Sequence, residues 1–315
     1  MTLTIGVDVG GTKVASGVVD PVGRILRAAS MPTPSTSAAE TAEAIATMVG
    51  ALRQSYDVEA VGIGAAGFVD EARSVVRFAP NLAWREEPLR AEVSARVGLP
   101  VVVENDANAM AWAEARFGAG RDEDHLVAVT VGTGIGGGMV LDGQLYRGRF
   151  GLGAEFGHVR VVPEGRRCGC GNTGCWEQYA SGRALVREAQ ELATASPVRA
   201  GRLLELGGGV VAGITGPEVT SAAIEGDPAA IECFAIVGRW LGQGLADLAA
   251  TLDPGVFVIG GGVSAADDLL LGPARSAYAA ALTGRGHRPL ADIRVAELGP
   301  EAGLVGAADL ARHRD

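Results

Sequence analysis

A glycine-rich hairpin pattern occurs twice in this chain, and it constrains the fold more than any other feature. Two runs rich in Val and Ile flank a glycine turn in residues 3–19, and the same pattern returns in residues 126–141. Such a pattern predicts an antiparallel hairpin. At an offset of 122 residues, Gly10 aligns with Gly132. A weak repeat with a domain-sized period predicts two copies of one topology.

Strand and helix patterns alternate after each hairpin. Expected helices cover residues 39–53, 88–97, 107–117, 181–192, 229–252, 269–282 and 301–312, and expected strands cover residues 59–63, 101–103, 256–259 and 293–296. Strands that alternate with helices predict an α/β fold with mixed sheets. We expect a small domain in residues 1–118, completed by a C-terminal helix in 301–315, and a large domain in 119–300.

Composition and charge exclude several classes of protein. Hydrophobic residues make up 48% of the 315, which is too many for a disordered chain. The net charge of −10 disfavours binding to nucleic-acid phosphates, so no nucleic-acid partner is expected. The longest uncharged apolar stretch, residues 126–141, contains five Gly and is shorter than the roughly 20 residues of a membrane span. Because the N-terminus has no basic region or cleavage site, we expect a cytoplasmic protein without a membrane partner.

Three glycine-rich loops are candidates for phosphate binding, because backbone N–H groups approach an anion closely where no Cβ intervenes. The first loop follows Asp8, whose carboxylate could hold Mg²⁺ directly or through water. The third follows the apolar run 256–259, at the end of a strand where ligands bind. A tight turn and a bulged hairpin are the alternatives for the first two loops. The candidate residues are Gly10, Gly11, Thr12 and Lys13; Gly132, Thr133 and Gly134; and Gly260, Gly261 and Gly262.

The segment from Glu104 to Asn108 directly follows the expected strand 101–103. A carboxylate at the end of a strand, where a helix begins, fits a catalytic base. The alternative is a helix N-cap, which either Asn105 or Asp106 could supply.

Three of the four cysteines lie within eight residues, and with a nearby histidine they form a candidate zinc set: His158, Cys168, Cys170 and Cys175. One His and three Cys satisfy a tetrahedral zinc ion, so we expect one structural Zn²⁺ per chain in residues 158–175. Such a zinc would hold nearby polar side chains in place. Scattered thiols and a nucleic-acid zinc ribbon are the alternatives, and the ribbon lacks a basic face. Cys233 is expected in the core.

Together these motifs resemble those of the ROK-family sugar kinases, and the resemblance covers essentially the whole chain. It is carried by Asp8-x-Gly-Gly-Thr-Lys, Glu-Asn-Asp106-Ala-Asn, Gly-Thr-Gly-Ile-Gly-Gly-Gly, Glu155-x-Gly-His158 and Cys168-x-Cys170-Gly-x-x-Gly-Cys175. Within the family, the chain looks most like the actinobacterial glucokinases. The resemblance implies the actin-like, ribonuclease-H-like two-domain ATPase fold, with ATP, Mg²⁺ and a sugar in a cleft between the domains.

The resemblance also implies residue roles. Asp106 would be the base that accepts the proton of the sugar 6-hydroxyl, and zinc would be bound by His158 and the three cysteines. Thr12 and Thr133, with their glycines, would face the phosphates, and Gly260 to Gly262 would lie near the nucleotide. The sugar would be bound by Asn81, Asn105, Asp106, Glu155, His158 and Glu177. One departure is Ala65-Ala66-Gly67, where many relatives have a proline-containing sugar loop.

The implied activity is transfer of the γ-phosphoryl group of ATP to the 6-hydroxyl of glucose, giving glucose 6-phosphate and ADP. A kinase for mannose, fructose or an N-acetylhexosamine, and a glucokinase that uses polyphosphate, are the alternatives. A sugar-sensing regulator on the same fold is an alternative of another class. It is disfavoured because the Asp8 loop begins within ten residues of the N-terminus and leaves no room for a DNA-binding segment. The resemblance further implies a homo-oligomer, either a dimer or a tetramer.

Overall fold

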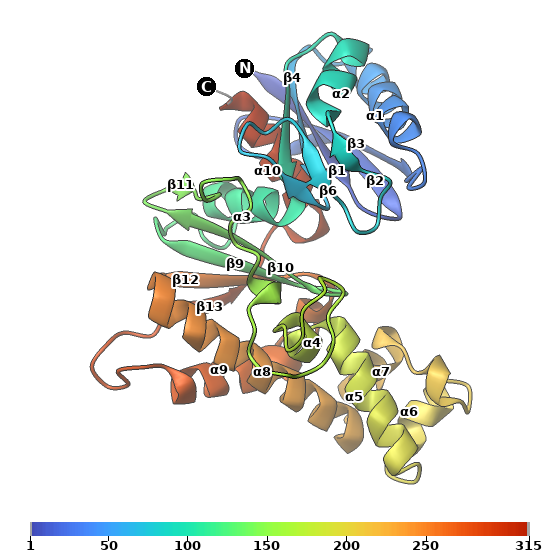
Figure 1. The fold of residues 1–315 in the computed structure, drawn as a ribbon, viewed down its shortest axis with the longest axis vertical. Helices are drawn as coiled ribbons and strands as arrows, with labels where there is room; N and C mark the ends of the chain where they lie inside the picture. Colours follow the sequence, from blue (N-terminus) through green and yellow to red (C-terminus); the bar gives the residue numbers. More distant parts are fainter. Residues whose placement is uncertain (1, 314–315) are drawn as a thin grey trace. The chain divides into compact units, whose positions relative to one another are not determined.

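The structure, a computed structural model, describes residues 2–313, except for the side chains of residues 264 and 265. Its contacts divide the chain into two compact units (Figure 1). Unit 1 comprises Met1–Ala128, Gly137–Ala154 and Ala296–Asp315, and unit 2 comprises Val129–Gly136 and Glu155–Val295. The C-terminal segment therefore lies in the same unit as the N-terminal segment.

Unit 1 is built on a mixed five-stranded sheet with the strand order β3-β2-β1-β4-β8. The strands are β1 (Leu3–Val9), β2 (Lys13–Val19), β3 (Ile25–Pro32), β4 (Val58–Ala65) and β8 (Val101–Asn105). β2 pairs antiparallel with β1 and β3, whereas β1, β4 and β8 are parallel. The predicted hairpin in residues 3–19 is confirmed as β1–β2. The carboxyl ends of the three parallel strands share one edge of the sheet, where ligands bind in open α/β sheets.

Helices cover both faces of this sheet: α1 (Ala38–Arg53), α2 (Leu89–Val97), α3 (Asp106–Phe117) and α10 (Ala302–Arg312), which follows the 3₁₀ turn η4 (Gly299–Glu301). α1 and α2 share one apolar core with the strands, and α10 lies on the opposite face (Figure 1). Glycines in the strands permit this packing of α10. A Cβ at Gly6 would lie 1.9 Å from the carbonyl oxygen of Leu304, and one at Gly62 would lie 1.7 Å from that of Ala307. The backbone of α10 therefore packs directly on β1 and β4.

Unit 1 also contains a small antiparallel sheet of order β5-β6-β7. Its strands are β5 (Phe68–Val69), β6 (Val76–Phe78) and β7 (Arg85–Glu87). The turn between β5 and β6 is held by Asp70, whose carboxylate accepts hydrogen bonds from the backbone N–H groups of Ser74 (2.8 Å) and Val75 (3.0 Å). Sequence reasoning missed these strands, because two or three residues are too few to show a period.

A second five-stranded sheet has the order β11-β10-β9-β12-β13. Its strands are β9 (Leu126–Val131), β10 (Ile135–Leu141), β11 (Gln144–Leu145), β12 (Val256–Gly260) and β13 (Asp292–Val295). The division between the units falls within β9 and β10. Numbered along the chain, the strands of this sheet follow the same order as those of the first. The duplicated topology predicted from the repeated hairpin is therefore confirmed, as are the mixed sheets of an α/β fold.

The rest of unit 2 is mostly helical. Its helices are α4 (Glu177–Ala180), α5 (Gly182–Ala195), α6 (Gly201–Leu206), α7 (Gly216–Ile224), α8 (Pro228–Leu252) and α9 (Asp268–Ala281), with 3₁₀ turns η1 (Phe156–His158), η2 (Val211–Gly213) and η3 (Gly262–Ala266). α8 begins at an Asp227 N-cap, whose side chain accepts a hydrogen bond from the N–H of Ala230. Gly242 on α8 permits close packing with α9, since a Cβ there would lie 2.1 Å from the carbonyl oxygen of Ala274.

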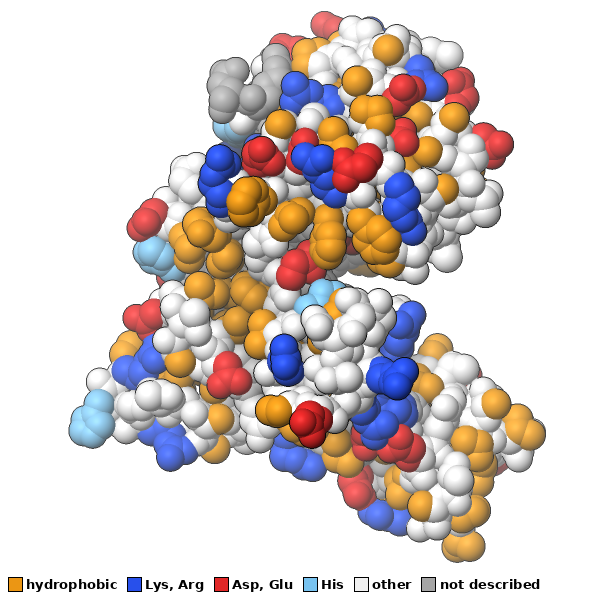
Figure 2. Space-filling view, viewed as in Figure 1, with side chains coloured by type: hydrophobic (Ala, Val, Ile, Leu, Met, Phe, Trp, Pro, Cys, Tyr) orange, Lys and Arg blue, Asp and Glu red, His pale blue; other side chains and the backbone are white. Residues whose placement is uncertain are grey.

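The surface of unit 1 carries charges of both signs. On the face shown in Figure 2, its Lys and Arg side chains are interspersed with Asp and Glu side chains. Several of them form exposed ion pairs, such as Arg77 with Glu86 at 2.6 Å and Arg96 with Glu92 at 2.6 Å. Among the residues that the structure describes, no helix is long and apolar enough to cross a membrane.

A buried carboxylate on α3 holds together two segments of unit 1 that connect to unit 2. Glu114 is 0% exposed. Its Oε2 accepts hydrogen bonds from the N–H groups of Ala119 (2.8 Å) and Glu297 (3.1 Å), and its Oε1 accepts one from the N–H of Leu298 (2.9 Å). Ala119 precedes the first passage of the chain into unit 2, and the other two residues follow its return. Of the four passages of the chain between the units, Glu114 thus holds together the segments that lead to the first and follow the last.

Replacing Glu114 with Ala is expected to lower the free energy of unfolding by about 3 kcal/mol, because three backbone N–H groups lose a charged acceptor. Urea denaturation followed by circular dichroism measures this change. The matched control is Glu297→Ala, which removes an exposed side chain paired with Arg121 at 2.6 Å and is expected to change stability by less than about 1 kcal/mol. Equal stability of the two variants would show that the Glu114 hydrogen bonds are unimportant.

Candidate functional site

Two carboxylates lie near the strand ends in unit 1. Asp8 is the penultimate residue of β1, and Asp106 is the first residue of α3, directly after β8. The pKa of Asp8 is raised to about 6, chiefly by burial and then by the nearby carboxylate of Asp106, whereas Lys13 lowers it. Burial also raises the pKa of Asp106, against the opposing effect of the hydrogen bonds that it accepts. Two acidic groups with raised pKa values at one sheet edge are typical of a functional site.

The side chain of Asn105 determines how Asp106 is oriented. Its Oδ1 caps α3 by accepting a hydrogen bond from the N–H of Asn108 (3.0 Å). Its Nδ2 donates to Oδ1 of Asp106 (3.0 Å) and to the carbonyl oxygen of Gly67 (3.1 Å). Asn105 is therefore the N-cap of α3, one of the two residues that the cap alternative allowed. The hydrogen bond from Asn105 reaches Oδ1 of Asp106, so the other carboxylate oxygen, Oδ2, lies outside it. The same amide ties Asp106 to the loop in which Ala65-Ala66-Gly67 departs from the proline pattern.

The first glycine loop forms the turn between β1 and β2. The N–H of Gly10 donates to the carbonyl oxygen of Lys13 (3.0 Å), and the hydroxyl of Thr33 donates to the carbonyl oxygen of Gly10 (2.8 Å). The side chains of Thr12 and Lys13 are exposed. A Cβ at Gly11 would lie 3.2 Å from Cβ of Asn81, so Asn81 is adjacent to the loop. The turn is fixed by its neighbours and presents its polar side chains to solvent.

The second and third glycine loops are adjacent to one another in unit 2. Gly261 has a φ of 89°, and a Cβ there would lie 2.5 Å from the carbonyl oxygen of Val131, at the end of β9. The carbonyl oxygen of Gly132 accepts a hydrogen bond from the N–H of Gly182 (2.8 Å) at the start of α5. Since a Cβ would not fit at Gly261, only glycine lets these loops approach so closely.

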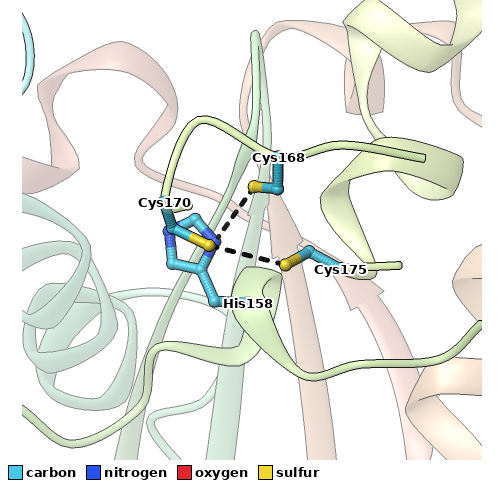
Figure 3. Close-up of side chains that lie close together, drawn as sticks. All are labelled: His158, Cys168, Cys170 and Cys175. Carbon is cyan, nitrogen blue, oxygen red and sulfur yellow. Dashed lines mark hydrogen bonds between the residues drawn. The ribbon is translucent and has the colours of Figure 1, made fainter. Parts of the chain in front are cut away.

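His158, Cys168, Cys170 and Cys175 form a compact cluster, with donor atoms that all lie within 4.8 Å of one another (Figure 3). Nδ1 of His158 lies 3.7 Å from Sγ of Cys168, and the Sγ atoms of Cys170 and Cys175 are 3.6 Å apart. Ligands at zinc bond lengths lie roughly 3.5–3.8 Å from each other in a tetrahedron. The four side chains therefore fit a zinc ion.

The thiols of the cluster have perturbed pKa values. The pKa of Cys168 is raised to about 12, chiefly by burial, and the hydrogen bond that Glu177 accepts from this thiol (3.0 Å) contributes to the rise. The pKa of Cys175 is raised by burial, whereas hydrogen bonds from neighbouring groups lower that of Cys170. Zinc binds thiolates, so metal binding would release the thiol protons, and affinity would fall as the pH falls.

Glu177 connects the cysteine cluster to the second glycine loop. Its Oε1 accepts the Cys168 hydrogen bond and lies 4.0 Å from Nδ1 of His158. A Cβ at Gly134 would lie 2.4 Å from Oε2 of Glu177. Glu155 directly precedes η1, and its carbonyl oxygen accepts a hydrogen bond from the N–H of His158 (3.1 Å). The cluster therefore lies next to each of the polar residues of unit 2 that were predicted to bind sugar.

Within unit 1 the structure brings together two groups of predicted residues: Asp8 with Asn105 and Asp106, and the first glycine loop with Asn81. Within unit 2 it brings together the cysteine cluster, Glu155, Glu177 and the other two glycine loops. Sequence reasoning missed the buried ion pair between Glu104 and Arg147, whose Oε2 and Nε atoms are 2.7 Å apart. A charged residue in the otherwise apolar β8 was a signal for Glu104, but nothing in the sequence singled out Arg147.

Comparisons with known proteins agree with this arrangement. The model of the ROK family matches residues 4–314. Glucokinase from Streptomyces coelicolor is 55% identical over 315 residues, covering 100% of this chain and 99% of the relative, and glucokinase from Thermotoga maritima is 36% identical over 312 residues, covering 98% and 97%. The crystal structure of a ROK family glucokinase from Streptomyces griseus in complex with glucose and AMPPNP matches with a TM-score of 0.90 and 56% identity, covering 99% of each chain.

The duplicated mixed sheets and the glycine loops at their strand ends define an α/β protein of the sugar kinase type. More specifically, the chain belongs to the ROK family, as its motifs indicated.

Proposed function

We propose that the protein is an ATP-dependent glucokinase, which transfers the γ-phosphoryl group of ATP to the 6-hydroxyl of glucose and releases glucose 6-phosphate and ADP. The observation that carries this proposal is the full-length similarity to glucokinases. It includes a structure at 56% identity that was determined with glucose and AMPPNP, an analogue of ATP. The fold of such a close relative, with the same coverage of both chains, supports the same substrates for this protein.

The carboxylate of Asp106 is the base in this proposal. A sugar alcohol is a weak nucleophile until its proton has an acceptor, and a carboxylate at hydrogen-bond distance supplies one. Burial raises the pKa of Asp106, which makes its carboxylate a stronger proton acceptor. The Asn105 amide holds one oxygen of this carboxylate and leaves the other for the substrate hydroxyl.

Charge neutralisation would be the task of Asp8 and of the three glycine loops, the first in unit 1 and the other two in unit 2. Phosphoryl transfer depends on positioning and on neutralising the phosphate charge more than on covalent chemistry. Asp8 has the donor chemistry to hold Mg²⁺, which would neutralise phosphate charge when bound with ATP. The glycine loops would supply backbone N–H groups to the phosphates: Gly10 and Gly11 with Thr12 and Lys13, Gly132 and Gly134 with Thr133, and Gly260 to Gly262 near the nucleotide.

Sugar recognition would use Asn81, Asn105 and Asp106 from unit 1 and Glu155, His158 and Glu177 from unit 2, because several hydroxyls require several polar groups. The His158–Cys168–Cys170–Cys175 cluster would hold one structural Zn²⁺. With its Nδ1 facing Cys168, the His158 ring would present Nε2 to a sugar hydroxyl. We further propose assembly as a dimer or tetramer.

A coupled assay across hexoses and phosphoryl donors tests the proposed function. The panel contains glucose, mannose, fructose and N-acetylmannosamine, each with ATP or polyphosphate, in the presence of Mg²⁺. We expect kcat/KM to be at least 10-fold higher for glucose with ATP than for any other combination. A higher kcat/KM with another hexose or with polyphosphate would show that this compound, rather than glucose or ATP, is the preferred substrate. Absence of phosphoryl transfer with every pair would refute the kinase assignment.

A further inference from the structure

A second carboxylate lies two residues before Asp106, and it is almost completely buried. Glu104 is 1% exposed and belongs to β8, in which it follows three valines. Removing an ionised carboxylate from water costs several kcal/mol, which only close cations and hydrogen bonds offset. The groups that contact Glu104 therefore indicate the role of this carboxylate.

Two guanidinium groups neutralise Glu104. Nε of Arg147 lies 2.7 Å from Oε2 and 3.0 Å from Oε1, and Nε of Arg73 lies 3.1 Å from Oε2. Arg147 is itself only 9% exposed. Its Nη1 and Nη2 donate to the carbonyl oxygens of Glu71 (3.0 Å) and Asp70 (2.8 Å), in the turn between β5 and β6. The planar guanidinium thus fixes the carboxylate against a turn that Asp70 already holds rigid.

The hydrogen bonds of Glu104 lead to the start of α3. Its Oε1 accepts from the backbone N–H of Asn105 (3.0 Å) and from Nδ2 of Asn108 (3.1 Å), and Asn108 is 2% exposed. Asn105 is the residue whose amide donates to Asp106. A continuous path of contacts therefore runs from Arg147 through Glu104 and Asn105 to Asp106.

We propose that Glu104, neutralised by Arg147, is a positioning residue that fixes the Asn105 amide and thereby orients the Asp106 carboxylate for proton acceptance. This inference rests on the proposed kinase function. The two guanidinium groups matter because an unpaired negative charge so close to Asp106 would disfavour the ionised base. With them, Glu104 provides hydrogen-bond acceptors to the first turn of α3 while its negative charge is more than offset.

If Glu104 and Arg147 have a purely structural role, a variant that replaces both residues together should behave differently from one that loses a positioning residue. Replacing a buried ion pair with apolar side chains of similar volume is often neutral for stability, whereas breaking it by removing one partner is strongly destabilising. The double variant Glu104→Met/Arg147→Met should therefore be more stable than a variant that loses Glu104 alone, although Arg73 loses its partner and Asn105 and Asn108 lose an acceptor. If the pair only holds the fold, this double variant should also retain turnover.

The experiment compares kcat, the KM values for glucose and ATP, and thermal unfolding for four proteins: the wild type, Glu104→Gln, the double variant and the control Glu86→Gln. Glu86 forms an exposed ion pair with Arg77 in the same unit. We expect kcat to fall about 10- to 100-fold in Glu104→Gln and in the double variant, with both KM values within about threefold of wild type, because a small misplacement of a catalytic group has effects of this size. The control should retain wild-type kcat.

The outcomes distinguish the positioning role of Glu104 from the proposed kinase function. A folded double variant with wild-type kcat would overturn the positioning role, and so would a loss of turnover that appears only as raised KM. Should the double variant fail to fold, Glu104→Gln decides, since it keeps the shape of the side chain but places an amide NH2 against Arg147 and Arg73 in place of a carboxylate oxygen. Wild-type kcat in a folded Glu104→Gln would then overturn the positioning role. A wild type that phosphorylates no hexose would instead refute the proposed kinase function on which this inference rests.

Discussion

The Asp106→Asn variant is expected to lose turnover by about 10³-fold, within the range that a general base contributes. Asparagine has the same shape and can still accept hydrogen bonds from the Asn105 amide and the N–H of Ala107, which are 3.0 Å and 2.9 Å long with aspartate. It cannot take up the proton of the sugar hydroxyl. We therefore expect kcat to collapse while the dissociation constant for glucose, measured by calorimetry, stays within about threefold of wild type.

The control for this change is Asp57→Asn, at an exposed position in the loop before β4. It removes the same charge from the same unit and is expected to leave kcat unaltered. The pH profile provides a second check. The base must be ionised, so kcat should fall as the pH falls through the pKa of Asp106, which burial places above the ordinary aspartate value of 3.8. Wild-type kcat in Asp106→Asn would rule out this residue as the base.

The parts of the fold that sequence reasoning predicted are those with a local signal. Alternating Val and Ile around glycines predicted β1–β2, and apolar residues at helical spacing predicted a helix over 39–53, close to the observed Ala38–Arg53. β3 was missed because most of its side chains are exposed, so it shows no buried run or alternation. The close packing of α10 on Gly6 and Gly62 joins segments about 300 and 250 residues apart, and no pattern along the chain encodes it.

The candidate site likewise contains residues that a local sequence signal predicted and partners that no local signal predicted. The carboxylate of Asp106 was predictable because it follows a short apolar strand, and three cysteines in eight residues predicted a compact cluster, which the structure contains. The partners of these residues were not predictable. Arg147 lies 43 residues beyond Glu104, and the cation that neutralises a buried charge is chosen by the fold rather than by spacing.

Loss of the proposed zinc ion should remove sugar binding, and this dependence follows from the position of Glu177. Its carboxylate contacts Cys168 on one side and closely approaches Gly134 on the other. A zinc ion would hold His158 directly and would also hold Cys175, two residues before Glu177. It would thereby fix both proposed sugar ligands, His158 and Glu177, although a Cys168 thiolate no longer donates a hydrogen bond to Glu177. Supporting residues around a metal site typically change affinity or activity by 10- to 100-fold.

The Cys170→Ser variant tests this dependence, because Cys170 is exposed and its replacement leaves apolar packing intact. We expect elemental analysis to find about one zinc per wild-type chain and well under half of that in the variant, with the KM for glucose raised at least 10-fold. The control is Cys233→Ser, which changes a buried thiol on α8 outside the cluster and should keep its zinc. Wild-type protein without zinc would refute the metal, whereas a variant that loses zinc but keeps its KM would show that the ion serves stability alone. The distinction matters because Cys168, which donates to Glu177 when it is a thiol, would become a thiolate on zinc, so the ion would also change what Glu177 can accept from a sugar hydroxyl.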